Sequence, residues 1–282
     1  MKNMILALGC SFTDKNFKSS MLPANYPNEI KSGWPMWPQI FTERLIERDQ
    51  KDYELRNVAK SGASMDYCVE KFFENWIVYK DRLKVVLWGG TNYFRLENFA
   101  TGEKIMINQF SDESKAKKTI TDAYLLDLAR RTTSKQIYIR QAKINHERIV
   151  SIRDLCEGYN VDFLYYPLVP PFAEGKSYKK VGGRKYPIKR HEELNYLAKA
   201  SPEAWRIITR DKNFLGTKNE TYNLFLPSGF DWINWTMTCS HKIKTNALIR
   251  HNKEWPNDDG HPSATGQKMI AEKYWNHYVK NF

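Results

Sequence analysis

This chain has few cysteines and no long hydrophobic run. These two features argue against a zinc site and against a membrane-spanning segment. Its 282 residues include four cysteines, with no Cys-x-x-Cys pair and no zinc-site spacing among them. The apolar run within Met1–Leu8 is too short for a signal-peptide core, and no other run is long enough to cross a bilayer. We therefore expect synthesis in the cytoplasm without a signal peptide, and no transmembrane segment. Cys10 and Cys68 are expected to be small, reduced core residues, although the sequence leaves a disulfide open.

Acidic residues are also few relative to basic ones. The chain has 44 Lys and Arg against 32 Asp and Glu, a formal net charge of +12. Such an excess suits contact with nucleic acid, contact with an acidic polysaccharide or membrane surface, or simply solubility. The densest basic stretch, Lys176–Arg190, is interrupted by glycine and proline, and no zinc-finger or ribonucleoprotein motif occurs. We expect no nucleic-acid partner, and the sequence leaves the oligomeric state open.

Short apolar runs alternate with helical patterns over much of the chain. Runs typical of buried strands occupy residues 4–8, 53–58, 84–88 and 161–166. Apolar residues recur at helical spacing in 37–45, 65–77, 114–131, 135–157 and 264–278, with Ser263 placed to cap the last of these helices. This alternation predicts an α/β fold of three layers, with helices on both faces of a parallel sheet. In the last helix, Ile270, Tyr274 and Tyr278 are expected to face the core.

The alternation stops between Pro170 and Pro256, where aromatic, glycine and basic residues are frequent. We interpret residues 170–256 as an irregular insertion near the carboxyl edge of the sheet, where open α/β folds bind their ligands. The motifs considered next lie at opposite ends of the chain and must meet in space. Residues 1–282 are therefore expected to form a single domain.

The Gly-x-Ser-x-Gly motif of many serine hydrolases is absent, but one serine is placed for the same chemistry. Ser11 follows the first predicted strand, within the sequence Gly-Cys-Ser-Phe-Thr-Asp of residues 9–14. A serine directly after a buried strand presents its hydroxyl and its N–H at the carboxyl edge of the sheet. Such a hydroxyl can be a nucleophile or can bond to the backbone, and for a lone serine the second role is commoner.

Two further motifs end the second and third predicted strands. Gly62 closes the sequence Asn-Val-Ala-Lys-Ser-Gly, and a glycine permits the close backbone approach that an N–H donor to a ligand needs. Asn92 closes Gly-Gly-Thr-Asn, and its side-chain amide can donate into the same space. Taken alone, each residue also suits a structural role, Gly62 in a turn and Asn92 as a loop cap.

A fourth motif, Asp-Asp-Gly-His-Pro, precedes the last predicted helix. Asp258 lies three residues before His261, and the glycine-containing turn lets its carboxylate reach the imidazole Nδ1. Asp259 competes for this role but is less well placed, and His261 alone would also suit a helix start without chemistry. The remaining histidines lack metal-ligand spacing, so we expect surface roles for them and no metal site; they are His146, His191, His241, His251 and His277.

Together these motifs resemble those of the SGNH (GDSL-like) hydrolase family, named for a Ser, Gly, Asn and His in that chain order. The matching residues here are Ser11, Gly62, Asn92 and His261, and the patterns Asn-x-Ala-x-x-Gly and Asp-x-x-His-Pro match as well. The resemblance covers roughly residues 4–92 and 258–278 and implies the family's flavodoxin-like fold. Two positions depart from it: Cys10 stands where an Asp usually precedes the nucleophile, and Tyr93 where an acidic residue usually follows the Asn.

The resemblance implies an esterase that hydrolyses acyl esters, most simply acetyl esters, without a cofactor. His261 would take the proton of Ser11, Asp258 would hold the imidazole, and an acyl-enzyme would form and then be hydrolysed by water. The N–H groups of Ser11 and Gly62 and the side chain of Asn92 would form the oxyanion hole.

The substrate is less well determined than the chemistry. Four tryptophans between Pro170 and Pro256 suit stacking on sugar rings, which favours an acetylated polysaccharide over a small-molecule ester, or they simply pack the insertion; they are Trp205, Trp232, Trp235 and Trp255. The composition also resembles SGNH proteins of tailed phages, which implies a virion-associated enzyme as one setting. Two alternatives stay open: a non-catalytic carbohydrate-binding or virion structural module that keeps the fold, and an acyltransferase that uses the same residues.

Overall fold

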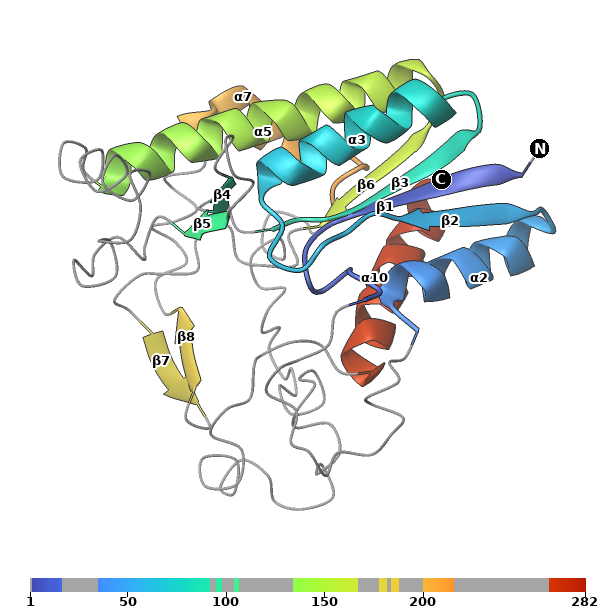
Figure 1. Ribbon diagram of the computed structural model, residues 1–282, viewed down its shortest axis with the longest axis horizontal. Helices are drawn as coiled ribbons and strands as arrows, with labels where there is room; N and C mark the ends of the chain where they lie inside the picture. The colour runs from blue at the N-terminus through green and yellow to red at the C-terminus, as the bar shows by residue number, and fades with distance from the viewer. Residues whose placement is uncertain are drawn as a thin grey trace.

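The computed structural model describes residues 2–16, 35–91, 95–97, 104–106, 134–166, 178–181, 184–187, 200–215 and 264–282. Within these residues, a parallel sheet lies between two layers of helices (Figure 1), as the alternation of strands and helices predicts. The elements in chain order are β1 (Asn3–Leu8), α2 (Trp37–Asp49), β2 (Tyr53–Asn57), α3 (Met65–Tyr79), β3 (Leu83–Gly89), β4 (Arg95–Glu97), β5 (Lys104–Met106), α5 (Ser134–Gly158), β6 (Asp162–Tyr166), β7 (Tyr178–Val181), β8 (Arg184–Pro187), α7 (Pro202–Arg210) and α10 (Ala264–Asn281).

The main sheet has the strand order β2-β1-β3-β6, and every neighbouring pair is parallel. The chain leaves β1 through α2 on one face of the sheet, and it returns from β2 to β3 through α3 on the other face (Figure 1). The order of the strands therefore reverses between β1 and β3. In open α/β sheets, ligands bind beside the carboxyl ends of the two strands that flank such a reversal.

Successive residues of each strand face opposite sides of the sheet, so the strands supply two hydrophobic cores. In β1, Met4, Leu6 and Leu8 face the core that α3, α5 and α7 cover, whereas Ile5 and Ala7 face the core that α2 and α10 cover. All five side chains are at most 1% exposed. A strand buried on both faces must be apolar throughout, which is why β1 appears in the sequence as an unbroken hydrophobic run.

The last helix packs against α2, as the predicted core face requires. Ile270, Tyr274 and Tyr278 are between 0% and 4% exposed. The Tyr274 ring stacks on Trp37 with ring centroids 4.1 Å apart, and its hydroxyl donates to the carbonyl of Trp88 in β3 at 2.8 Å. These contacts join the C-terminal helix to an N-terminal helix and to the centre of the sheet.

Part of the stretch interpreted as an insertion belongs to the core fold. Between residues 170 and 256 the structure describes the hairpin β7–β8 and residues 200–215, which include α7. After α7, Phe214 lies parallel to Tyr165 of β6, with the Tyr165 N–H donating to the Asn213 carbonyl and the Leu215 N–H donating to the Tyr165 carbonyl, both at 2.9 Å. The segment after α7 therefore lies beside β6, at the edge of the four-stranded sheet, and pairs with it through one parallel bridge.

One predicted helix face is wider in the sequence than in the structure. Apolar residues recur through 65–77, but in α3 only some of them are covered: Phe72 and Trp76 are buried, whereas Phe73 is 42% exposed and Ile77 is 75% exposed. Residues next to each other in a helix lie about 100° apart, because 3.6 residues make one turn. The hydrophobic core therefore includes Phe72 and Trp76 but not the residue that follows each of them.

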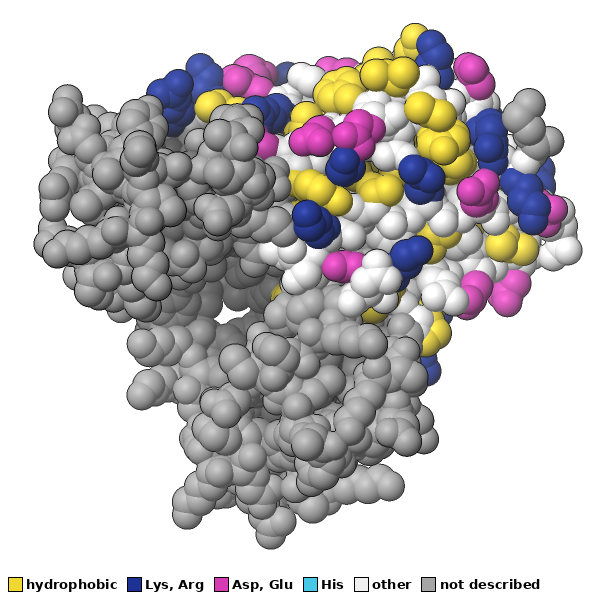
Figure 2. All heavy atoms as spheres, viewed as in Figure 1, with side chains coloured by type: hydrophobic (Ala, Val, Ile, Leu, Met, Phe, Trp, Pro, Cys, Tyr) yellow, Lys and Arg dark blue, Asp and Glu magenta, His cyan; other side chains and the backbone are white. Residues whose placement is uncertain are grey.

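The cysteine prediction is confirmed where the structure describes it. Cys10, Cys68 and Cys156 are fully buried and none of these three thiols is in a disulfide, whereas Cys239 lies outside the described residues. Burial raises the pKa of the Cys156 thiol. None of the described helices is long and apolar enough to span a membrane. On the face drawn in Figure 2, basic and acidic side chains are interspersed over the coloured part of the surface.

Candidate active site

Ser11 lies in a tight turn directly after β1. The carbonyl of Cys10 accepts two backbone N–H groups, from Thr13 and from Asp14, each at 2.9 Å. The chain therefore reverses within one turn of Ser11 rather than continuing along the strand. Ser11 is only 5% exposed, so its side chain is held inside the protein at the carboxyl edge of the sheet.

Gly9 is the residue that allows this turn. Its φ is +151°, a conformation that side chains rarely adopt. A Cβ at this position would lie 2.5 Å from Thr13 Oγ1 and 2.9 Å from the carbonyl oxygen of Gly89 in β3. The turn can therefore fold back against β1 and β3 only because residue 9 has no side chain.

Two side chains from elsewhere in the chain hold the far side of this turn. The indole N–H of Trp37 donates to Thr13 Oγ1 at 3.2 Å. Gln267 of α10 donates from Nε2 to the carbonyl of Phe12 at 3.2 Å and accepts the Trp37 backbone N–H at 2.9 Å. The first turn of α10 is therefore fixed beside the residue that follows Ser11.

The loop after β2, which contains Gly62, runs alongside the Ser11 turn. The backbone N–H of Val58 donates to Ala7 at 3.0 Å, and that of Lys60 donates to Gly9 at 3.1 Å. The Asn57 side chain closes the pair of loops, because its Nδ2 donates to the Thr13 carbonyl at 2.7 Å. The first residue of the Asn-x-Ala-x-x-Gly motif thus has a structural role that its residue type alone does not reveal.

The end of the Gly62 loop is bonded to both neighbouring segments. The Ser61 N–H donates to Asp14 Oδ2 at 2.8 Å, and Gly62 itself has φ +71°, in the left-handed region. On the other side, the buried hydroxyl of Thr91 donates to the carbonyl of Ala63 at 2.9 Å. The segments that follow β1, β2 and β3 therefore meet at one edge of the sheet.

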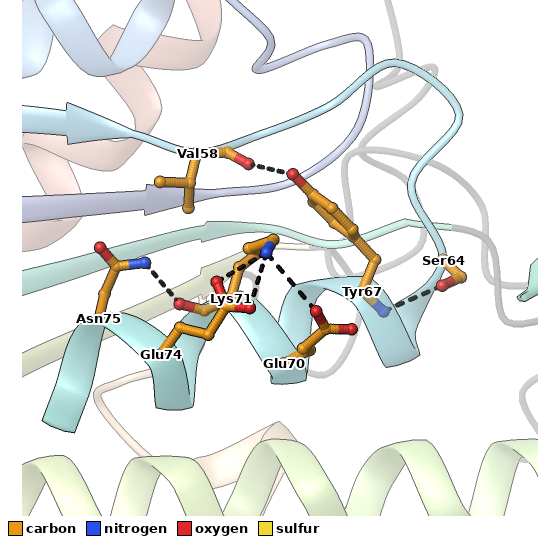
Figure 3. A network of polar contacts seen from close by, with 7 residues as sticks. All are labelled: Val58, Ser64, Tyr67, Glu70, Lys71, Glu74 and Asn75. Carbon is orange, nitrogen blue, oxygen red and sulfur yellow. Dashed lines mark hydrogen bonds and ion pairs between the residues drawn. The ribbon is translucent and has the colours of Figure 1, made fainter. Parts of the chain in front are cut away.

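The start of α3, which follows this loop, carries its own polar network (Figure 3). Ser64 caps the helix by accepting the Tyr67 N–H at 3.0 Å, and the Tyr67 hydroxyl donates to the carbonyl of Val58 at 3.0 Å. Lys71 pairs with Glu74 at 2.6 Å on the exposed side of the helix. The helix cap and the Tyr67 bond both fix the Gly62 loop against α3.

The predicted site residues divide into two groups. Ser11 and Gly62 lie on adjoining, hydrogen-bonded loops at the same sheet edge. The others lie outside the described residues: Asn92, Asp258, Asp259, His261, Trp232, Trp235 and Trp255. Two described residues are close to them in sequence, since Thr91 directly precedes Asn92 and α10 begins at Ala264, three residues after His261.

Two residues at this edge have a structural role that the sequence alone does not indicate. Asp14 belongs to the Gly-Cys-Ser-Phe-Thr-Asp motif, but its bond to the Gly62 loop arises only in the folded chain. Gln267 is a polar residue on the face of α10 that also carries Ile270 and Tyr274, and it is 1% exposed. A polar residue at a core position of a helical pattern was therefore the available signal for Gln267.

The expected surface role is wrong for His146. This residue of α5 is 1% exposed, and its ring stacks on Trp205 with centroids 5.8 Å apart. Burial lowers the pKa of His146 to about 3, so the ring is neutral at pH 7. Trp205, one of the four tryptophans considered for sugar stacking, thus packs against α5 and the adjoining core.

The imidazole of His277 bonds to the carbonyl of Lys212, and burial lowers its pKa. His191, His241, His251 and His261 lie outside the described residues. Among the residues with described positions, no three His, Cys, Asp or Glu side chains are grouped as a metal site would require.

Comparisons with known proteins add likenesses of fold. No protein-family model matches the chain, and no curated protein matches it in sequence. Among solved structures, the lipase Lip_vut3 from a goat rumen metagenome aligns at 10% identity over 98% of this chain and 97% of its own, with a TM-score of 0.47. The esterase EstA from Pseudoalteromonas sp. aligns at 12% identity over 99% and 98%, with a TM-score of 0.41. The acetyl xylan esterase AlAXEase aligns at 12% identity over 97% and 98%, with a TM-score of 0.40. At these scores the functional argument depends on this chain's own residues.

Proposed function

We propose that this chain is a serine esterase of the SGNH type that cleaves acyl esters through an acyl-enzyme on Ser11. The observation that carries the proposal is the joining of the Ser11 turn to the Gly62 loop beside the reversal between β1 and β3. A nucleophile and a backbone donor are needed within reach of one carbonyl group, and these two loops are bonded to each other at the sheet edge where such folds bind ligands.

The remaining members of the proposed site follow from chain connectivity. Asn92 is covalently joined to Thr91, whose side chain bonds the Gly62 loop. His261 lies three residues before Ala264 at the start of α10, a span of about 11 Å at most. Gln267 in the first turn of that helix bonds the residue next to Ser11. These tethers favour Asn92 as an oxyanion donor and His261 as the base.

In the proposed mechanism, His261 removes the Ser11 proton while Asp258 holds the imidazole in the required tautomer. Ser11 Oγ attacks the ester carbonyl, and the N–H groups of Ser11 and Gly62 with the Asn92 amide stabilise the oxyanion. Collapse of the tetrahedral intermediate expels the alcohol, which takes a proton from His261. Water then attacks the acyl-enzyme with His261 as base and releases the acid. No step needs a metal or a cofactor.

For the substrate, we propose an acetyl group on a polysaccharide. The three tryptophans Trp232, Trp235 and Trp255 have flat faces suited to sugar rings, and their stretch of chain leads into the Asp258 motif. The test compares the wild type on two substrates. Acetate release from an acetylated polysaccharide should be much faster than cleavage of long-chain lipid esters, and a preference for long acyl chains would reject the polysaccharide.

The test of the esterase itself is labelling with a fluorophosphonate probe, followed by mapping of the modified residue. Such probes react with activated serine hydroxyls, so the adduct should be on Ser11 and should block hydrolysis of a short nitrophenyl ester. Labelling at Ser61 or Ser64 would reassign the nucleophile. A chain that neither reacts nor hydrolyses the ester would be a non-catalytic module with the same fold.

A further inference from the structure

Asp14 forms a hydrogen-bonded bridge between the Ser11 turn and the Gly62 loop. It is 7% exposed, and its two carboxylate oxygens accept two different backbone N–H groups. Oδ1 accepts the N–H of Asn16 at 2.8 Å, which holds the carboxylate within its own turn. Oδ2 accepts the N–H of Ser61 at 2.8 Å, across 47 residues of sequence. Asp14 therefore links the segment of the nucleophile to the segment of the proposed oxyanion donor.

The bond between Asp14 and Ser61 matters because of where it lies along the Gly62 loop. Three other bonds between the two loops, from Asn57, Val58 and Lys60, lie nearer the strands. The bond from Asp14 reaches Ser61, the residue directly before Gly62. It therefore acts on the peptide next to the left-handed glycine, where the backbone has the most freedom to rotate.

We propose that Asp14 is a positioning residue for the oxyanion hole, because its carboxylate fixes the Ser61–Gly62 backbone relative to Ser11. The inference rests on the proposed esterase function, in which the Gly62 N–H stabilises the oxyanion. A carboxylate suits this position because both of its oxygens accept hydrogen bonds. An asparagine has the same size, but its amide nitrogen would face one of the two N–H groups and could not accept from it. The Asp14→Asn variant should therefore lose one of the two bonds with little change in volume.

The expected effect is on turnover rather than on substrate binding. A donor that is displaced by about 1 Å can lower the rate by roughly 100-fold, because the oxyanion forms only as the ester reacts. We expect Asp14→Asn to lower kcat on nitrophenyl acetate by about 10- to 100-fold, with KM changed by less than about twofold. Rates are divided by the amount of Ser11 that a fluorophosphonate titrates, so that a loss of folded protein does not count as a loss of kcat.

Amide hydrogen exchange supplies a measurement that does not depend on catalysis. Protection of the peptide containing Ser61 and Gly62 should fall in Asp14→Asn, since the Ser61 N–H loses its acceptor. Asp211→Asn is the matched control, because Asp211 Oδ1 likewise accepts the N–H of the residue two positions on, Asn213, at 2.8 Å. The control should leave both kcat and the exchange at residues 61 and 62 unchanged.

The possible results distinguish the role of Asp14 from the esterase function itself. Loss of protection together with a lower kcat in Asp14→Asn alone supports the inference. Unchanged protection, or a kcat within twofold of the wild type, overturns it while leaving the esterase in place. A similar fall in kcat in the Asp211→Asn control also overturns it, because the effect would then be general. A wild type that fluorophosphonate does not label overturns the esterase and this inference with it.

Discussion

Polar side chains bond differently at the carboxyl ends of the parallel strands, the carboxyl edge, than at their amino ends, the amino edge. At the carboxyl edge, the side chains of Asp14, Asn57 and Gln267 bond mainly to backbone atoms of neighbouring loops. At the amino edge, polar side chains bond to one another: Tyr278 donates to Asp162 at 2.8 Å, and Tyr53 donates to Asp49 at 2.6 Å. The first arrangement fixes the course of loops, whereas the second joins helices to the starts of strands.

The buried groups Asp162 and Tyr278 at the amino edge have shifted pKa values, and Arg48 lies beside them. Burial raises the pKa of Asp162 and that of Tyr278, and the Asp162 charge raises the Tyr278 pKa further. The Arg48 guanidinium lies 4.8 Å from the centroid of the Tyr278 ring. Polar groups at the amino edge stabilise the fold. Substitutions there should change the free energy of unfolding, whereas substitutions at the carboxyl edge should change turnover.

The largest effect is expected at Ser11. Ser11→Ala should reduce hydrolysis of a short nitrophenyl ester by roughly 10⁴-fold or more, because no acyl-enzyme can form without the hydroxyl. Thermal unfolding should change little. Measured turnover that persists in this variant would show that the carboxyl edge, however well ordered, is not built around Ser11.

The next effect distinguishes two neighbouring acids. Asp258→Asn should lower kcat by about 1000-fold or more, because the imidazole of His261 would lose the partner that sets its tautomer. Asp259→Asn is the matched control and should retain most of its activity. If the two variants have equal rates, or if Asp259→Asn is the slower, the orienting acid must be reassigned.

A smaller loss is expected at Asn92. Asn92→Ala should lower kcat by about 100- to 1000-fold, since one donor is lost from a preorganised oxyanion hole. Circular dichroism and thermal unfolding should match those of the wild type. An unchanged kcat would make Asn92 a loop cap and would limit the chemistry of this edge to the loops after β1 and β2.

Away from both edges, His146 should make stability depend on pH. Its folded pKa is about 3, below the ordinary value of 6.5, so the unfolded chain binds more protons between these values. Stability is therefore full above pH 6.5 and is lost as the pH falls toward 3. Denaturant unfolding should show a loss of up to about 2 kcal/mol between pH 7 and pH 5. His146→Gln should lose clearly less over the same interval, and an equal loss would show that other groups are responsible.

The smallest effect is expected at the amino edge. Tyr278→Phe removes the hydrogen bond to Asp162 and should cost about 1 kcal/mol of unfolding free energy. Urea denaturation measures this cost. The kcat of the variant on a nitrophenyl ester should equal that of the wild type, and a parallel loss of turnover would show that the two edges are coupled.

The sequence was most informative where hydrophobicity alone determines whether a residue is buried. The strands β1, β2, β3 and β6 and the core face of α10 were predictable, because burial on one or both faces of an element leaves a hydrophobic period. The pairing of Phe214 with β6 after α7 was missed, because a single bridge produces no detectable hydrophobic alternation in the sequence. His146 was misplaced for a related reason, since its burial depends on α7 lying over α5.

For the site, the sequence predicted that the loops after β1 and β2 would meet but not which bonds join them. Ser11 and Gly62 were each placed by the end of a predicted strand, and the structure brings their loops together. The bonds from Asp14 and Gln267 depend on distances between residues 47 and 255 positions apart in the chain. No local pattern encodes such pairs, so their roles could be assigned only from the fold.

The bond between Gln267 and Phe12 also affects when the proposed active site is completed during synthesis of the chain. Ser11 is synthesised before α10, yet the turn that holds it is completed by this helix, which follows more than 250 residues later in the chain. Contacts this distant in sequence form late in folding, because a long loop must close first. A nascent chain that ends before α10 would contain Ser11, the proposed nucleophile, but would lack Gln267 and Tyr274, which bonds the centre of the sheet. The proposed activity should therefore arise only after α10 has been synthesised and has docked on the sheet.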